Sequence, residues 1–176
     1  MRASVFIGTS VDGFIARPKG ELDWLPQGDV EEHGYTAFFE SVDALVIGRG
    51  TFETVLTFGA WPYGKKPVVV LSSRPLDLSS VKGNNVQQMS GTPGEIVSRL
   101  ESQGVNHIYV DGGVTIQRFL RAGLIQRLII TRIPVLIGSG VPLIGALAVD
   151  IRLEHIETRS YPTGLVRSEH LAVPTR

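Results

Sequence analysis

Cysteine is absent from the 176-residue chain, so disulfides, thiolate metal ligands and cysteine nucleophiles are excluded. The four histidines include no pair spaced as H-x-x-x-H, and we predict no metal site. An excess of positive charge is missing too, since 17 Lys and Arg balance 17 Asp and Glu. That balance argues against nucleic acid or an acidic membrane as a partner, because both require a basic surface.

Long uninterrupted apolar runs are also lacking. The segment 128–149 is apolar, but Arg132, Pro134 and Pro142 interrupt it, whereas a membrane span needs about 20 apolar residues. The apolar stretch near the N-terminus is too short for a signal peptide, and Asp12 follows it closely. We therefore expect a cytoplasmic protein with no membrane partner.

Segments typical of strands and helices alternate along the chain, whose length fits a single domain over residues 1–176. We predict strands at 3–9, 44–47, 67–71, 85–88, 107–110 and 127–135, and helices at 29–42, 51–56, 93–103 and 114–122. Two further strands, 151–160 and 165–173, form a terminal hairpin. This order predicts an α/β fold: a mixed, mostly parallel sheet flanked by helices on both faces, with a C-terminal antiparallel hairpin.

Two of the predicted helices begin with capping signals. Thr92, Pro93 and Glu95 supply a cap, a proline at the first helical position and a glutamate at the third. Asp29 and Glu32 form a variant of the same pattern before the helix at 29–42.

Three predicted strand ends carry groups that favour anions, and ligands of open α/β sheets bind beyond the carboxyl ends of strands. The first is "VIGRGTFE", where Gly48 and Gly50 allow close approach, Arg49 can bind a phosphate, and a helix begins at Thr51. A glycine turn before a helix more often has a purely structural reason.

The second strand end, "VVLSSRP", offers the hydroxyls of Ser72 and Ser73 and the charge of Arg74. In the third, "YVDGGVTIQRFL", Gly112 and Gly113 join a strand directly to a helix and leave N–H groups free. Three such ends together indicate a long ligand with several phosphates, such as a dinucleotide. Neither G-x-G-x-x-G nor G-x-x-x-x-G-K-[ST] occurs, which excludes the usual dinucleotide and NTPase fingerprints.

The chain resembles the dihydrofolate reductase-like superfamily, and within it the C-terminal reductase domain of the bifunctional riboflavin biosynthesis protein. The resemblance extends from Ala3 to about Val173. It is carried by "SVDGFIA" (10–16), "GRGTFE" (48–53), "LSSR" (71–74), "DGG…FL…AGL" (111–124) and "PVLIGSGVPL" (134–143).

The resemblance implies an NADPH-dependent reductase with the cofactor across the strand ends. It places Gly8, Ile15 and Ala16 beside the nicotinamide; Gly48, Arg49 and Thr51 at the cofactor phosphates and the nicotinamide side; Ser72 and Arg74 at the adenosine 2′-phosphate; and Gly112, Gly113, Val114 and Thr115 around the pyrophosphate. It also implies a cis peptide bond between Gly112 and Gly113.

Two positions depart from the resembled families. Dihydrofolate reductases carry an acid near the start of the first helix, and Asp29, Glu31 and Glu32 are candidates here, although acids in a first turn often serve only as caps. The riboflavin-type reductases have a lysine in the first strand where this chain has Phe6, and Asp111 keeps their acid before Gly-Gly.

We therefore predict an NADPH-dependent reductase that transfers hydride to a C=N or C=O carbon of a small heterocyclic substrate, pterin-like or ribosylaminopyrimidine-like. The proton would come from Asp111, from Asp29 or Glu32, or from water. Alternatives are an NADPH-binding module without turnover and a structural or oligomerising use of the fold. The segment 135–149 could form a homodimer interface or could cover the chain's own core.

Overall fold

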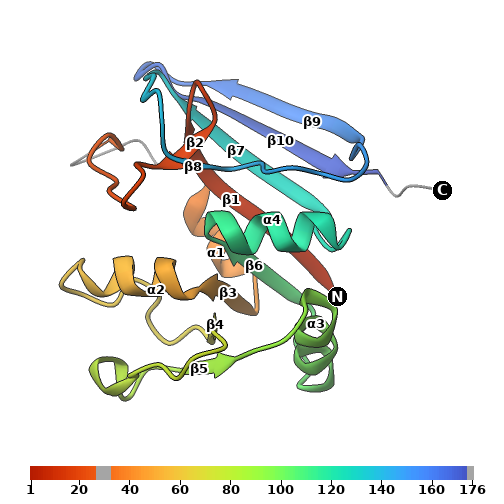
Figure 1. Cartoon of the computed structure of the whole chain (residues 1–176). Coiled ribbons are helices and arrows are strands. Elements are labelled where there is room, and N and C mark those ends of the chain that lie inside the picture. The colour runs from red at the N-terminus through yellow and green to blue at the C-terminus, as the bar shows by residue number, and fades with distance from the viewer. Residues whose placement is uncertain (27–32, 174–176) are drawn as a thin grey trace.

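The computed structural model describes residues 1–26 and 33–173. An eight-stranded sheet has the order β5-β4-β3-β6-β1-β7-β10-β9 (Figure 1). The neighbouring strands from β5 to β7 run parallel, and β10 is antiparallel to both β7 and β9. The strands are β1 (Arg2–Ser10), β3 (Ala44–Gly48), β4 (Val68–Leu71), β5 (Val86–Met89), β6 (His107–Asp111), β7 (Arg127–Ile133), β9 (Leu153–Ser160) and β10 (Val166–Ala172). The predicted fold class and terminal hairpin are confirmed.

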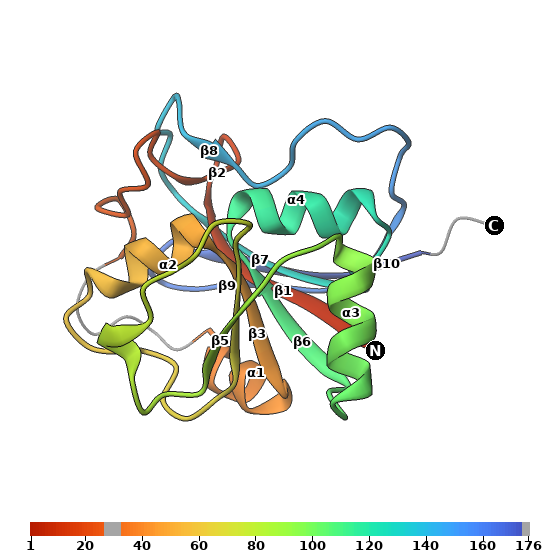
Figure 2. The same cartoon turned by 60° about the horizontal axis from the view of Figure 1, so that its bottom comes forward.

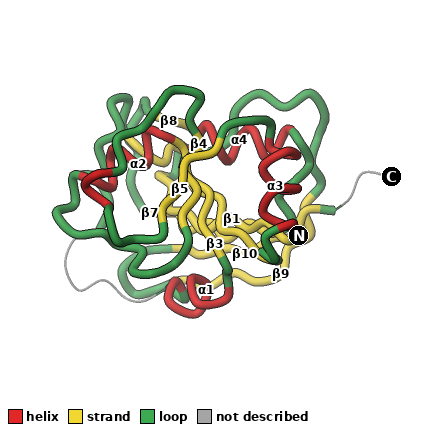
Figure 3. Tube along the Cα trace, turned by 90° about the horizontal axis from the view of Figure 1, so that it is seen from below, coloured by secondary structure: helices red, strands yellow, loops and turns green. Residues whose placement is uncertain are grey.

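Helices cover both faces of the sheet, as predicted. They are α1 (Tyr35–Ser41), α2 (Arg49–Leu56), α3 (Pro93–Ser102) and α4 (Gly113–Arg121), with a short 3-10 helix at Ser79–Val81. Seen along the sheet, α1 lies on one side and α3 and α4 lie on the other (Figure 3). Within residues 1–26 and 33–173, no helix has the length and apolar character needed to cross a membrane.

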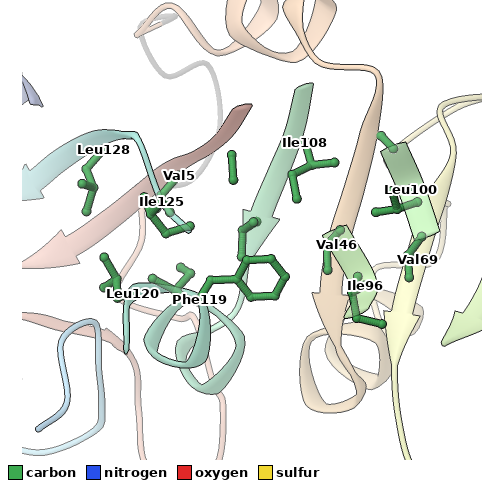
Figure 4. Close-up of a cluster of buried hydrophobic side chains, with 14 of the residues drawn as sticks. Val5, Val46, Val69, Ile96, Leu100, Ile108, Phe119, Leu120, Ile125 and Leu128 are labelled. Atoms are coloured by element: carbon green, nitrogen blue, oxygen red, sulfur yellow. The ribbon is translucent and has the colours of Figure 1, made fainter. Parts of the chain in front are cut away.

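The two faces of the sheet bury separate hydrophobic clusters because side chains alternate along each strand. On β3, Val46 packs with α3 and α4 in one cluster, whereas Leu45 and Ile47 pack with α1 and α2 in the other. Figure 4 shows Ile96 and Leu100 of α3 and Phe119 of α4 in the first cluster. Burial on both faces explains the continuous apolar runs in the central strands.

The start of α3 confirms the predicted capping box. The Thr92 hydroxyl accepts a hydrogen bond from the Glu95 N–H at 3.3 Å, and the Glu95 carboxylate accepts one from the Thr92 N–H at 2.7 Å. These bonds satisfy N–H groups that a helix start otherwise leaves without partners.

Two local predictions were wrong in extent. The first helix begins at Tyr35 after Gly34, whose φ of 85° is not helical, and not at residue 29. Asp29, Glu31 and Glu32 lie outside the described residues. The glycines and prolines of "IGSGVPLIG" (137–145) predict a loop, but this segment contains β8 (Val141–Pro142), which pairs with β2 (Phe14–Ala16) beside the start of α4 (Figure 2). Two or three residues are too few for a strand pattern to be recognised.

The segment 135–149 does cover the chain's own core in part. Leu143 is buried, and Leu147 packs against the cluster under α3 and α4. Leu136 and Val149 remain exposed, at 71% and 67%. A homodimer contact through the exposed part stays a prediction.

Leu100→Ala in α3 should lower the free energy of unfolding by about 2–5 kcal/mol, because a buried leucine leaves a cavity when it is truncated. Leu100 is 1% exposed. The matched control is Leu153→Ala, since Leu153 on β9 is 45% exposed; its effect should be about 0.5 kcal/mol or less. Urea unfolding followed by circular dichroism measures both, and equal losses would contradict the assigned core.

Candidate functional site

A cavity of about 1220 Å³ lies at the carboxyl ends of the central strands. Every residue predicted to contact the cofactor lines it: Gly8, Ile15, Ala16, Gly48, Arg49, Thr51, Ser72, Arg74, Gly112, Gly113, Val114 and Thr115. Asp111 lines it as well. The fold thus brings the three strand ends together, while the roles of these residues remain predictions. Over the described ranges, no group of three or more His, Asp or Glu side chains could hold a metal ion.

The turn between β3 and α2 presents a helix start that no side chain caps. Gly48 is the N-cap residue and makes no side-chain cap hydrogen bond. The helix begins at Arg49, earlier than the predicted Thr51, so Arg49 and Gly50 belong to its first turn. Arg49 Nε donates to Glu53 Oε1 at 2.7 Å, and its Nη1 donates to the carbonyl of Pro75 at 3.4 Å. The uncapped N–H groups and the guanidinium favour an anion here.

The turn between β6 and α4 is a second uncapped helix start. Gly112 has a φ of 93° and provides no side-chain cap. Its bond to Gly113 is trans, so the expectation of a cis bond is wrong; the chain reverses direction through the positive φ, which glycine adopts without strain. α4 begins at Gly113, and residues of its first turn line the same cavity as those of α2.

The two turns pack directly against each other. A Cβ atom at Gly48 would lie 2.7 Å from Thr115 Oγ1, and one at Gly112 would collide with Thr51 Oγ1. Only glycine permits this approach at both positions, so the structural explanation for these two glycines holds. The packing also fixes the spacing of the two helix starts.

The end of β4 is a tight turn that exposes a guanidinium. The Ser72 hydroxyl donates to the Arg74 carbonyl at 2.7 Å, and Gln88 Nε2 donates to the carbonyls of Ser72 and Arg74, each at 2.9 Å. The Arg74 side chain is exposed at the cavity. Arg118, which sequence reasoning missed, also lines the cavity, and its Nη2 donates to the Gly91 carbonyl at 2.9 Å. Its spacing could have indicated it, because Arg118 follows Thr115 by three residues on α4 and residues three apart share a helix face.

A wall of aromatic side chains lines another part of the cavity. We call it the aromatic wall; its members are Phe6, Tyr35, Tyr63 and Tyr109. The rings of Phe6 and Tyr35 meet edge to face at 5.5 Å, and the Tyr109 hydroxyl donates to the Phe6 carbonyl at 2.8 Å. Sequence reasoning missed the three tyrosines. Tyr109 could have been found, because it lies two residues before Asp111 on one strand and so shares its face.

Asp111 is the half-buried carboxyl beside this wall. It ends β6, and its Oδ1 accepts a hydrogen bond from the Gly112 N–H at 2.7 Å. Burial raises the pKa of Asp111 to about 6, and the Gly112 hydrogen bond opposes that rise. Burial, together with the Asp111 charge, also raises the pKa of Tyr35 to about 12. Asp111 therefore exchanges a proton near neutral pH, while the phenols stay neutral.

A family model for the RibD C-terminal domain matches residues 4–167. The chain belongs to this family. Uncharacterized protein YwjB of Bacillus subtilis is 31% identical over 160 residues, 89% of this chain and 90% of that protein. The crystal structure of a putative riboflavin biosynthesis protein from Shewanella sp. PV-4 is 39% identical with a TM-score of 0.91, covering 99% of this chain and 100% of that one.

A dihydrofolate reductase from Enterococcus faecalis, complexed with NADP(H) and RAB-propyl, has the same fold. It matches with a TM-score of 0.67 at 16% identity, covering 97% of this chain and 96% of that one. The predicted dihydrofolate reductase-like fold is thereby confirmed.

The titration of Asp111 should make the chain less stable as the pH rises. The pKa of Asp111 in the folded chain, about 6, lies above the ordinary aspartate value of 3.8. The folded state therefore binds the proton more tightly between these values, and the free energy of unfolding falls as the pH rises through that window. Urea unfolding from pH 4 to pH 7 should show this decline relative to Asp111→Asn, which lacks the titrating group.

Carbon-detected NMR provides the internal control. The carboxyl carbon of Asp111 should titrate near pH 6, whereas that of Asp43, whose pKa is lowered by hydrogen bonds from the backbone N–H groups of Asn106 and His107, should titrate below the ordinary value. If the difference in unfolding free energy between wild type and Asp111→Asn did not change with pH, the raised pKa of Asp111 would be contradicted.

Proposed function

We propose that the protein is an NADPH-dependent reductase that transfers hydride to a C=N or C=O carbon of a small heterocyclic substrate. The observation that carries this proposal is a single cavity that joins three anion-favouring strand ends to a half-buried carboxyl. Its volume, about 1220 Å³, exceeds what one small ligand needs, so a cofactor and a substrate fit side by side. Family membership and the shared fold support the same activity.

The residues at the strand ends suit NADPH. The uncapped starts of α2 and α4 would bind the pyrophosphate through N–H groups, with Arg49 as a cation beside them. Ser72 and Arg74 would bind the 2′-phosphate, and Arg118 adds a third guanidinium to this part of the cavity. Gly8, Ile15 and Ala16 would border the nicotinamide. The bound cofactor supplies the hydride, and the protein supplies position and electrostatic environment.

Asp111 would hold the proton that the reduced substrate needs. A carboxyl with a pKa of about 6 holds a proton in a useful fraction of molecules near neutral pH. Its place at the end of β6, beside both the aromatic wall and the glycine turn, would bring it next to both a bound substrate and a bound cofactor. Asp29, Glu32 and water remain the other candidates for this role.

Arg49→Ala should weaken NADPH binding roughly 10- to 100-fold, the loss expected for a charge-assisted hydrogen bond to phosphate. Its exposed contact with Glu53 contributes little to stability, so the variant should stay folded. Isothermal titration calorimetry measures the affinity, with Arg159→Ala on β9 as the control. An unchanged affinity would show that the cofactor map is wrong and would favour a structural use of the fold.

Arg74→Ala should abolish the preference for NADPH over NADH. The guanidinium is expected to contact only the 2′-phosphate, so NADPH affinity should fall roughly tenfold or more while NADH affinity stays the same. Fluorescence titration with both cofactors gives the ratio. Loss of affinity for both cofactors alike would instead assign Arg74 to the pyrophosphate. Binding of NADPH without oxidation across pterins, ribosylaminopyrimidines and aldehydes would favour a binding module without turnover.

A further inference from the structure

The sheet face that α1 covers continues onto β7, β10 and β9, which lie at one end of the strand order (Figure 1). Ile129 of β7 belongs to the cluster packed with α1, so Arg127 and Thr131, two residues before and after it, share its face. The strand register extends this face onto β10, where Glu169 lies opposite Ile129 and Arg167 lies opposite Thr131. This part of the face is separate from the cavity, whose lining includes none of these residues.

On this face, β10 and β9 place like charges directly opposite each other. Arg167 is in register with Arg159, and Glu169 is in register with Glu157. We call Arg159 and Arg167 the arginine pair. Opposed like charges destabilise a sheet unless a charge of the other sign lies close by. Glu169 has such a partner, because Arg127 Nε donates to its Oε1 at 2.8 Å and holds the pKa of Glu169 below its ordinary value.

Arg167 is the buried member of the arginine pair. Its side chain is 12% exposed, and a Cβ atom at Gly34 would lie 3.9 Å from its Cζ and Nη2. Its Nη2 reaches Glu169 Oε2 at only 3.4 Å, and its Nε is buried with no hydrogen-bond partner within residues 1–26 and 33–173. A guanidinium has five N–H donors, and a buried charge is costly unless it is paired. One distant carboxylate, shared with Arg127, therefore leaves Arg167 short of acceptors.

Two further polar atoms beside Arg167 are buried without a partner in the described part of the chain. They are the hydroxyl oxygen of Thr131, opposite Arg167 in the register, and Nε2 of His33, the residue before Gly34. Packing holds the imidazole in place, since the rings of His33 and Tyr161 meet edge to face at 4.6 Å. Buried polar groups nearly always have a partner, and an exception calls for an explanation such as a bound water or ion.

We propose that the arginine pair, Thr131 and His33 form a binding site for a small oxyanion, a phosphate or carboxylate group. Such a group accepts two parallel N–H bonds from one guanidinium, which would satisfy Nε and one Nη of Arg167. The Thr131 hydroxyl, and His33 in the tautomer that carries hydrogen on Nε2, would donate to the same ion. Arg159 supplies the second charge and opens the site to solvent, because its side chain is 64% exposed.

The opposed charges of the arginine pair favour an ion over water. A water molecule could accept hydrogen bonds from these donors, but it would leave the two positive charges opposed. Arg159 Nε donates to Glu157, which neutralises the exposed member of the pair and not the buried one. An oxyanion supplies both the acceptors and the charge.

The proposed site lies near the cavity and is independent of the proposed function. Gly8 lines the cavity and is in register with Thr131, which is in register with Arg167. Two strand spacings of about 4.8 Å place the backbone of Arg167 roughly 10 Å from that of Gly8. The oxyanion is therefore either a free ion or the acidic group of a larger molecule, and the experiment distinguishes these sources.

Inorganic phosphate is the probe, titrated into isotope-labelled protein at an ionic strength held constant with sodium chloride. In proton–nitrogen NMR spectra, the side-chain Nε–H of Arg167 and the backbone amides of Gly34 and Thr131 should shift until they saturate. The amides of Gly50 and Gly113 report the strand-end cavity, so phosphate bound there is counted separately. Sodium chloride alone should not reproduce the shifts.

Arg167→Gln should weaken phosphate binding at this site roughly tenfold or more, the loss expected for a hydrogen bond to a charged group. Thr131→Val should weaken it roughly 3- to 10-fold, yet without phosphate it should melt at the same or a higher temperature, because it removes a buried hydroxyl that lacks a partner. A hydroxyl with a merely structural role would instead lower the melting temperature when removed. Arg132→Gln is the matched control, since Arg132 follows Thr131 on β7 but is exposed on the opposite face.

Methyl phosphate distinguishes the two sources. Binding as tight as that of inorganic phosphate assigns the acidic group of a larger molecule, whereas binding of inorganic phosphate alone assigns a free ion, and either result supports the site. Shifts that do not saturate, or that Arg167→Gln and Arg132→Gln weaken alike, would show only general attraction to positive charge and would overturn the proposal.

Sedimentation velocity tests whether a second copy of the chain neutralises the arginine pair instead. A dimer that Arg167→Gln dissociates, with no phosphate shifts at β10, would overturn the proposal. Calorimetric titration of the same variants with NADPH tests the proposed function by itself, because neither Arg167 nor Thr131 lines the cavity.

Discussion

The site depends on the close packing of two glycine turns at neighbouring strand ends. The turn after β3 and the turn after β6 touch through Gly48 with Thr115 and through Gly112 with Thr51. A side chain at either glycine would push the turns apart. Because α2 and α4 begin at these turns, the packing also places two uncapped helix starts at one cavity. The parallel pairing of β3 with β6 makes this arrangement possible.

The charged side chains that line the cavity come from several elements. Guanidiniums come from α2, the end of β4 and α4, whereas the half-buried carboxyl comes from the end of β6 beside the aromatic wall. Burial raises the pKa of Asp111 to about 6, while Arg49 is paired with Glu53 and Arg118 donates to the Gly91 carbonyl. The same sheet edge therefore carries both guanidiniums and a carboxyl with a raised pKa.

Local sequence signals predicted the strand ends well and the tertiary partners poorly. Glycines, short hydroxyl residues and arginines after apolar runs identified the three turns, since these features depend on residues close in the chain. Tyr35 and Tyr63 belong to the cavity because α1 and the turn after Trp61 fold onto the same face as β6, and no spacing within either segment indicates that. The β2–β8 pairing joins segments more than a hundred residues apart. The bounds of the first helix also depended on Gly34, whose positive φ delays its start.

The two glycines of "GRGTFE" have different structural reasons, close packing at one and open space for a ligand at the other, which the sequence alone could not distinguish. Packing against Thr115 accounts for Gly48. Gly50 is different: a Cβ atom there would meet nothing within 4 Å, and its φ needs no glycine. Glycine within a helix costs roughly 0.5–1 kcal/mol relative to alanine. Gly50 lies in the first turn of α2 and lines the cavity. No neighbour in the described structure would clash with a larger side chain there, so packing does not explain the glycine. The open space beside its backbone would let a ligand approach closely, which is the physical reason to propose a cofactor phosphate at this turn.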